Sequence, residues 1–127
     1  MRIIPTKIKE SIIDRFPKEN TLAIIIFGSY GTEKQSKESD IDIAWIPKKK
    51  VPITELAIKT HELQQVLDNS VDLKIVTQNY TIALRKSIFE GDVIYESDDF
   101  KHYINDFYIE NSDVIDILNW RQMYGNK

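Results

Sequence analysis

A chain of 127 residues, 42% apolar and 29% charged, has the size and composition of one globular domain. The absence of cysteine excludes disulfides, thiolate metal sites and cysteine nucleophiles. The net charge is −3, whereas proteins that bind nucleic acid through its phosphates usually carry an excess of basic residues. We therefore expect no direct contact with long nucleic acids.

The apolar runs of the sequence are short. The longest, Leu22–Phe27, is far below the length that spans a bilayer. The opening residues, MRIIPTKIKES, lack the apolar core of a secretory signal. We therefore expect a cytoplasmic protein without membrane contact. Because no repeat or linker interrupts the pattern, we also expect a single domain over residues 1–127.

Helix and strand patterns alternate along the first part of the chain. Apolar residues at helical spacing predict a helix from Thr6 to Phe16, which Pro17 ends. The branched run Leu22–Phe27 predicts a strand buried on both faces. Residues 28–39 predict a polar loop, and Ile41–Ile46 predicts a second strand.

The alternation continues after the second strand. The sequence predicts a helix over Ile53–Leu67, a strand over Val71–Val76 and a helix over Ile82–Phe89 with Gly91 as its C-cap. A short edge strand over Val93–Tyr95 follows.

From Asp98 onward, one apolar stripe predicts a single C-terminal helix. The whole pattern predicts an α/β (α+β) fold with a mixed sheet, flanking helices and a C-terminal helix.

The first strand delivers Gly28 and Ser29 at its carboxyl end, where open α/β sheets bind ligands. Glycine lets a phosphate approach the backbone without a Cβ in the way. Serine offers a hydroxyl and a backbone amide as donors to phosphate oxygens. We interpret these two residues as a binding site for a triphosphate.

Three aspartates follow on the next two strands. Asp40 and Asp42 are two residues apart, so their side chains share one face of a strand. Asp72 lies at the start of the third predicted strand, and it joins them if the strands are neighbours with their apolar faces aligned. Such carboxylates suit magnesium, which takes substrate phosphates as its remaining ligands.

These motifs resemble a known family. Gly28–Ser29, ten further residues and then Asp40-Ile41-Asp42, with a later aspartate on a strand, are similar to the signature of the polymerase-beta-type nucleotidyltransferase superfamily. Within it, GSYGTEKQSKESDIDIAWI and LRKSIFEGDVIYES resemble the MNT-type (minimal nucleotidyltransferase) antitoxins of HEPN/MNT toxin–antitoxin pairs. The resemblance covers most of residues 20–97.

The resemblance implies an enzyme, a protein adenylyltransferase that moves AMP from ATP to a tyrosine of a cognate HEPN-domain toxin. It implies that Asp40, Asp42 and Asp72 are catalytic and bind two Mg²⁺ ions, and that Gly28 and Ser29 bind ATP. It also implies a hetero-oligomer of this antitoxin with the toxin. Two alternatives stay open: a small-molecule nucleotidyltransferase of the aminoglycoside-modifying kind, and a module that blocks the toxin sterically with little catalysis.

Other polar and aromatic residues are interpreted first as structural. The run Lys48–Lys50 is typical of a solvated loop, with contact to phosphate or to an acidic partner as the alternative. Lys74 is expected to pair with an acidic side chain of a neighbouring strand, with contact to the triphosphate as the alternative. Arg85 and Lys86 fit a solvated helix face, with contact to phosphates as the alternative. Trp120 falls off the C-terminal stripe, which leaves packing and partner contact equally open.

Overall fold

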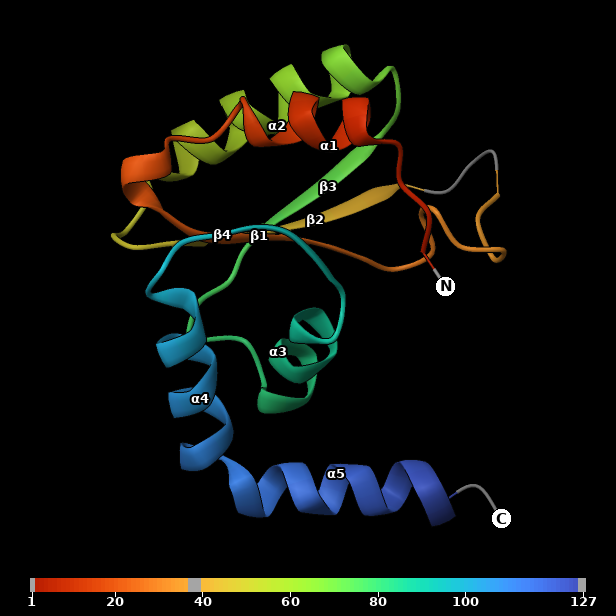
Figure 1. Ribbon diagram of the computed structural model, residues 1–127, viewed down its shortest axis with the longest axis vertical. Helices are drawn as coiled ribbons and strands as arrows, with labels where there is room; N and C mark the ends of the chain where they lie inside the picture. Colours follow the sequence, from red (N-terminus) through yellow and green to blue (C-terminus); the bar gives the residue numbers. More distant parts are fainter. Residues whose placement is uncertain (1, 37–39, 126–127) are drawn as a thin grey trace.

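The computed structural model describes residues 2–36 and 40–125 (Figure 1). Its helices and strands alternate as the sequence predicts. In chain order they are α1 (Thr6–Ile13), the 3₁₀ turn η1 (Lys18–Asn20), β1 (Thr21–Phe27), β2 (Ile41–Pro47), α2 (Ile53–Leu67), β3 (Val71–Ile75), α3 (Ile82–Phe89), β4 (Asp92–Glu96), α4 (Phe100–Glu110) and α5 (Ser112–Tyr124).

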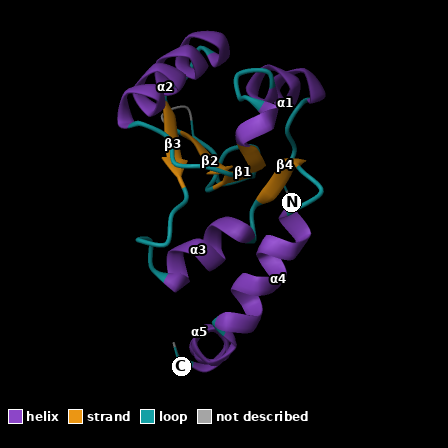
Figure 2. Ribbon diagram, turned by 90° about the vertical axis from the view of Figure 1, so that its left-hand side faces the viewer, coloured by secondary structure: helices purple, strands orange, loops and turns teal. Residues whose placement is uncertain are grey.

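Four strands form one mixed sheet in the order β3-β2-β1-β4. The central strand β1 pairs antiparallel with β2 and with β4, whereas β2 and β3 run parallel. Helices α1 and α2 cover one face of the sheet, and α3 and α4 cover the other (Figures 1 and 2). Helix α5 packs on α3 and α4, farthest from the sheet. The predicted α+β fold with a mixed sheet is confirmed.

The core consists of two apolar layers, one on each face of the sheet. Alternate residues of β1 serve the two layers: Ile24 and Ile26 face α1 and α2, and Ala23 and Ile25 face α3 and α4. All four are at most 1% exposed. The prediction of a strand buried on both faces is therefore confirmed. None of the helices in the described ranges is both long and apolar enough to cross a membrane.

The first helix is shorter than predicted. It ends at Ile13 rather than at Phe16, because the amides of Arg15 and Phe16 bond to carbonyls only three residues back, which tightens the last turn. Phe16 also precedes Pro17, which disfavours helical backbone. The Phe16 ring then packs edge-on against Trp45, with centroids 5.1 Å apart.

The C-terminal stripe forms two helices where one was predicted. The chain bends at Asn111, whose backbone leaves the helical region at φ −116° and ψ 20°. Its side-chain amide donates to the carbonyl of Phe107 at 2.8 Å, which is the kind of local bond that competes with a continuing helix.

The prediction of Gly91 as the C-cap of α3 is wrong. Glu90 caps α3 in a right-handed conformation, and positive φ among the described glycines occurs at Gly28 and Gly31. A Cβ at Gly91 would lie 2.7 Å from the carbonyl oxygen of Ile26. Glycine is needed there because the chain passes close to β1 as it enters β4.

One buried hydrogen-bond chain gives a test of this core. Thr21 accepts from the Trp45 indole at 3.1 Å and donates to the Pro17 carbonyl at 2.6 Å. Thr21→Val should lower the free energy of unfolding by about 1–3 kcal/mol, because both partners lose their bond away from water. Urea unfolding followed by tryptophan fluorescence measures this. Thr60→Val, which removes a hydroxyl bonded to the Leu56 carbonyl on α2, should cost less; equal losses would contradict the buried role.

Candidate active site

The end of β1 and the beginnings of β2 and β3 meet at one end of the sheet. The strand pairing sets Phe27 opposite Asp42, and Asp42 opposite Asp72. Neighbouring residues in register project to the same face of a sheet, so the carboxylates of Asp42 and Asp72 lie side by side. The structure thus brings together two of the three predicted aspartates.

Gly28 lies directly against the carboxylate of Asp42. It has φ +76°, and a Cβ placed there would lie 2.1 Å from Oδ2 of Asp42. Any other residue would overlap the carboxylate as well as adopt a strained backbone. The sequence pattern attributed this glycine to the approach of a phosphate. The structure adds a second reason, which is the carboxylate itself.

Arg2, which the sequence pattern did not indicate, holds the loop that follows β1. Its guanidinium donates to the carbonyls of Tyr30 at 2.6 Å and Gly28 at 2.9 Å. The amide of Ile3 also donates to the carbonyl of Gly31 at 2.8 Å. These contacts join residues more than 25 positions apart, so no local sequence pattern could have indicated them.

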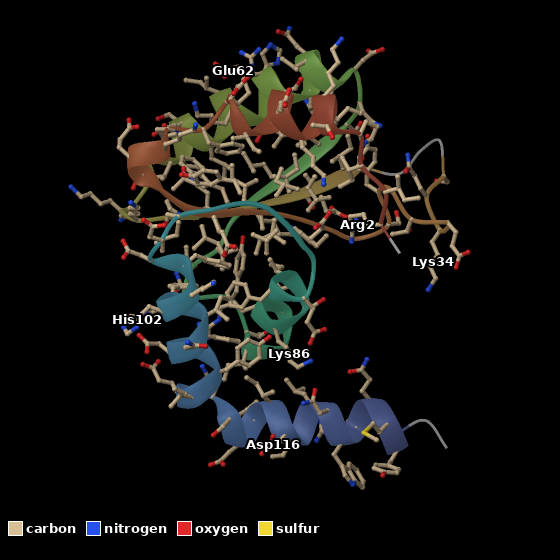
Figure 3. All side chains as sticks on the ribbon, in the orientation of Figure 1. Arg2, Lys34, Glu62, Lys86, His102 and Asp116 are labelled. Atoms are coloured by element: carbon tan, nitrogen blue, oxygen red, sulfur yellow. The ribbon has the colours of Figure 1, made fainter. Side chains whose placement is uncertain are left out.

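Ser29 lies in this same loop, beside a small hollow. Its carbonyl accepts from both the amide and the hydroxyl of Thr32, at 3.0 and 2.5 Å. Gly28, Ser29, Thr32, Glu33 and Lys34 line the hollow, which has a volume of about 380 Å³. Arg2 and Lys34 lie at this end of the molecule (Figure 3). Lys34 is a basic residue at the rim that the sequence analysis did not single out.

Asp40 stands just before β2 rather than within it, and it is exposed. The preceding residues 37–39 lie outside the described part of the chain. Within residues 2–36 and 40–125, no group of three or more acidic or histidine side chains is arranged to hold a metal ion. The structure therefore pairs Asp42 with Asp72 and leaves Asp40 beside them.

The carboxylates of the site repel one another. Burial raises the pKa of Asp42 above the ordinary value, and the negative charges of Asp72 and Asp40 raise it further, while the ammonium group of Lys74 opposes them. Lys74 contacts Asp72 at 3.1 Å. The ammonium group of Lys74 thus offsets part of the negative charge of Asp42 and Asp72. A divalent cation fits this oxygen-rich, negatively charged donor set.

The predictions for Lys74, Arg85 and Lys86 are confirmed only in part. Lys74 does pair with an acidic residue, although Asp72 belongs to its own strand. Lys86 is buried, at 9% exposed, and forms an ion pair with Glu90, so its assignment to a solvated face is wrong. Arg85 donates to the Tyr80 carbonyl and stacks over a phenylalanine ring of α4.

Comparison with known proteins identifies the family of this site. The family model "Polymerase beta, Nucleotidyltransferase" matches residues 10–100. No curated protein matches the chain. Among solved structures, a mutant MntA–HpeT toxin–antitoxin is similar with a TM-score of 0.63 and 22% identity, over 91% of this chain and 98% of that one.

Two further solved structures are similar. A toxin–antitoxin with AMP-PNP has a TM-score of 0.59 and 23% identity, over 88% of this chain and 95% of that one. A tri-AMPylated Shewanella oneidensis HEPN toxin in complex with MNT antitoxin has a TM-score of 0.56 and 22% identity, over 88% of this chain and 96% of that one. At these identities the likeness establishes a shared fold.

The contact between Gly28 and Asp42 can be tested by a double-mutant cycle. Gly28→Ala should destabilise the fold, because the new methyl group overlaps the carboxylate and alanine is strained at this φ. In the Asp42→Ala background the same change should cost only the backbone strain, about 1–2 kcal/mol. Chemical denaturation of the four proteins measures the coupling. Equal costs in both backgrounds would show that the two residues do not touch.

The raised pKa of Asp42 predicts a gain in stability when its charge is removed. As the pH rises, the unfolded chain loses this proton before the folded protein does, so ionisation of Asp42 lowers stability above its folded pKa. In EDTA at neutral pH, Asp42→Asn should therefore melt a few degrees above the wild type. Scanning fluorimetry should show that this gain shrinks at acidic pH. Asp40→Asn, at an exposed position, should give a smaller gain; an Asp42→Asn advantage that persists undiminished in acid would contradict the assignment.

Proposed function

The chain belongs to the polymerase beta nucleotidyltransferase family, and we propose that it is a protein adenylyltransferase that neutralises a HEPN-domain toxin as its antitoxin. The donor is ATP with two magnesium ions, the acceptor is a tyrosine hydroxyl of the toxin, and the reaction takes place in the cytoplasm. The observation that carries the proposal is the pairing of Asp42 with Asp72 directly beside the Gly28–Ser29 loop.

The proposed donor site combines this loop with the carboxylates. The Gly28–Ser29 loop would bind the β and γ phosphates through its amides and the serine hydroxyl, with Lys34 at the rim of the hollow. Asp40, Asp42 and Asp72 would hold the magnesium ions through their oxygens. Bound magnesium neutralises the charge of the triphosphate and of the leaving pyrophosphate. Holding the donor in line with the acceptor is the remaining contribution of the protein.

The transfer step needs a group that accepts the proton of the acceptor hydroxyl. The acceptor oxygen forms a bond to the α-phosphorus while the bond from that phosphorus to the bridging oxygen breaks, and pyrophosphate leaves. Asp72 takes the proton of the acceptor hydroxyl and passes it to solvent. This matters because a tyrosine hydroxyl has a pKa of about 10 and is protonated at neutral pH. The Asp72 side chain is 43% exposed and oriented by Lys74, so an incoming acceptor can reach it.

The openness of the site favours a large acceptor. Asp40 is exposed, and Asp72 and Lys74 are both partly exposed at the end of the sheet. A small molecule bound there would leave the reacting groups in water, whereas a folded protein brings a surface that covers them. Two similar structures support the choice of nucleotide and partner, since one has AMP-PNP and the other pairs an MNT antitoxin with an AMPylated HEPN toxin.

Helix α5 supports a lasting complex with a protein partner. Its exposed side carries large apolar residues: Ile117 is 54% exposed, Trp120 60% and Met123 66%. Apolar side chains gathered on one helix face typically mark a protein interface. We therefore propose a hetero-oligomer with the toxin, in which steric cover adds to the chemical modification.

The proposal predicts a modified toxin. After incubation of a HEPN toxin with ATP, magnesium and this protein, the intact mass of the toxin should rise by one or more units of AMP. Asp42→Asn should abolish the increase, and Asp72→Asn should slow it by about a hundredfold or more, as expected for loss of a general base. Toxin with its acceptor tyrosine changed to phenylalanine is the matched control and should keep its mass.

Other outcomes would assign a different function. A toxin that keeps its mass yet is silenced equally by the wild type and by Asp42→Asn would indicate steric blocking. Transfer of AMP to an aminoglycoside, with no transfer to any toxin, would indicate a small-molecule nucleotidyltransferase.

A further inference from the structure

The outer edge of β3 is an open edge of the sheet. β3 pairs with β2 on one side and is the last strand in the order (Figure 2). The amide of Ile41 donates to the carbonyl of Ser70, and the amide of Val76 donates to the carbonyl of Trp45. In a parallel ladder, alternate residues bond to the same neighbour. The even-numbered residues of β3 therefore direct their backbone N–H and C=O groups toward β2, and the odd-numbered residues direct theirs outward.

Gln64 of α2 shows that this outer edge accepts a partner. Its side-chain carbonyl accepts the amide of Val71 at 3.2 Å, in the place that a carbonyl of an additional strand would take. The next residues of β3 whose backbone N–H and C=O groups point outward are Leu73 and Ile75. Gln64 thus covers the first position of the edge, and the ladder can continue from the second.

A groove runs along this edge between β3 and α2. Two hollows of about 420 and 690 Å³ lie next to each other along this edge, with Ile53 and Leu56 in the lining of both. One end contains Asp72, and the other reaches Lys48–Lys50. Ile53 lines both hollows and is 80% exposed, so its apolar side chain is accessible to a segment bound in the groove. The groove is therefore apolar in the middle and basic at one end, and its other end reaches Asp72, whose carboxylate lies on the opposite face of the sheet beside Asp42.

We propose that this edge is the acceptor-binding site, where an extended polypeptide segment pairs with β3 as a fifth strand. The inference rests on the proposed function, because it takes the acceptor to be a protein tyrosine. A residue opposite Asp72 in the added strand projects to the same face as Asp72, with Cβ atoms about 4.5–5.5 Å apart. Asp42, Asp72 and the acceptor tyrosine then stand in one row across three neighbouring strands.

The rest of the groove specifies the chemistry of the segment. Side chains alternate along a strand, so the neighbours of the tyrosine point toward α2, where Ile53 and Leu56 favour apolar residues. At the far end, Lys48–Lys50 favour acidic residues. The acceptor segment is thus a tyrosine, a stretch of alternating apolar residues and an acidic end, held by main-chain bonds to Leu73 and Ile75.

A pair of isoleucines on α2 gives a matched test. Ile53→Glu places a charge in the groove, whereas Ile58→Glu places the same charge on the same helix at a residue that is 59% exposed and lines neither hollow. The probes are short synthetic peptides with tyrosine at one end, alternating valine and threonine, and glutamates at the other, made in both chain directions. For the better peptide, Ile53→Glu should raise the KM for AMP transfer by about tenfold or more. Ile58→Glu should leave it unchanged, and ATP affinity should be equal in both.

Nuclear magnetic resonance tests the contact without the reaction. Adding the same peptide, or its version with phenylalanine in place of tyrosine, should shift the backbone amide signals of Leu73 and Ile75. These shifts without AMP transfer would support the binding site and count against the proposed function. Transfer with equal KM in both isoleucine variants, no shift at these amides, or a second copy of the chain occupying the edge as a dimer would overturn the binding site.

Discussion

The position of β2 between β1 and β3 is the constraint on which the site depends. Because Phe27, Asp42 and Asp72 stand in one row of the ladder, the end of β1 and both carboxylates meet at one place. Side chains alternate along a strand, so a slip of one residue would turn Asp42 to the opposite face. The buried Ile43 and Trp45 resist such a slip, since neither could leave the core without loss of apolar contact. Packing on the opposite face of β2 therefore holds the carboxylates in register.

The same place combines several unfavourable interactions. Asp42 is partly buried beside two other carboxylates, with the ammonium of Lys74 as their opposing charge, and Gly28 has no room for a side chain. Such features lower stability and persist because surrounding contacts hold them, here the guanidinium bonds from Arg2 to the loop. A site that is strained without ligand gains more when a cation and a triphosphate bind, because binding then relieves repulsion.

Sequence patterns predicted the parts of this site that depend on local order. Asp42 and Asp72 could be assigned to one cleft because strand periodicity and burial fix which way a side chain points. Gly28 was recognised because it ends a buried run. Arg2 was missed because its partners lie 25 or more residues away, and a local sequence pattern does not indicate such a contact. The bend at Asn111 was missed because a continuous apolar stripe cannot show where a side-chain amide will interrupt the backbone ladder.

The topology that creates the catalytic row also leaves it at the border of the sheet. β3 is the last strand, so Asp72 has a partner strand on one side and open space on the other. Proteins protect such edges with charges, short strands or covering elements, because an open edge invites unwanted pairing. Here β3 is short, carries the charged Asp72 and Lys74, and has its first outward amide covered by Gln64. These features protect the edge against unspecific strand pairing, yet they leave the backbone N–H and C=O groups of Leu73 and Ile75 directed outward. An edge guarded only in part suits a surface that must admit one particular segment, with the apolar middle and the basic end of the groove as the means of selection.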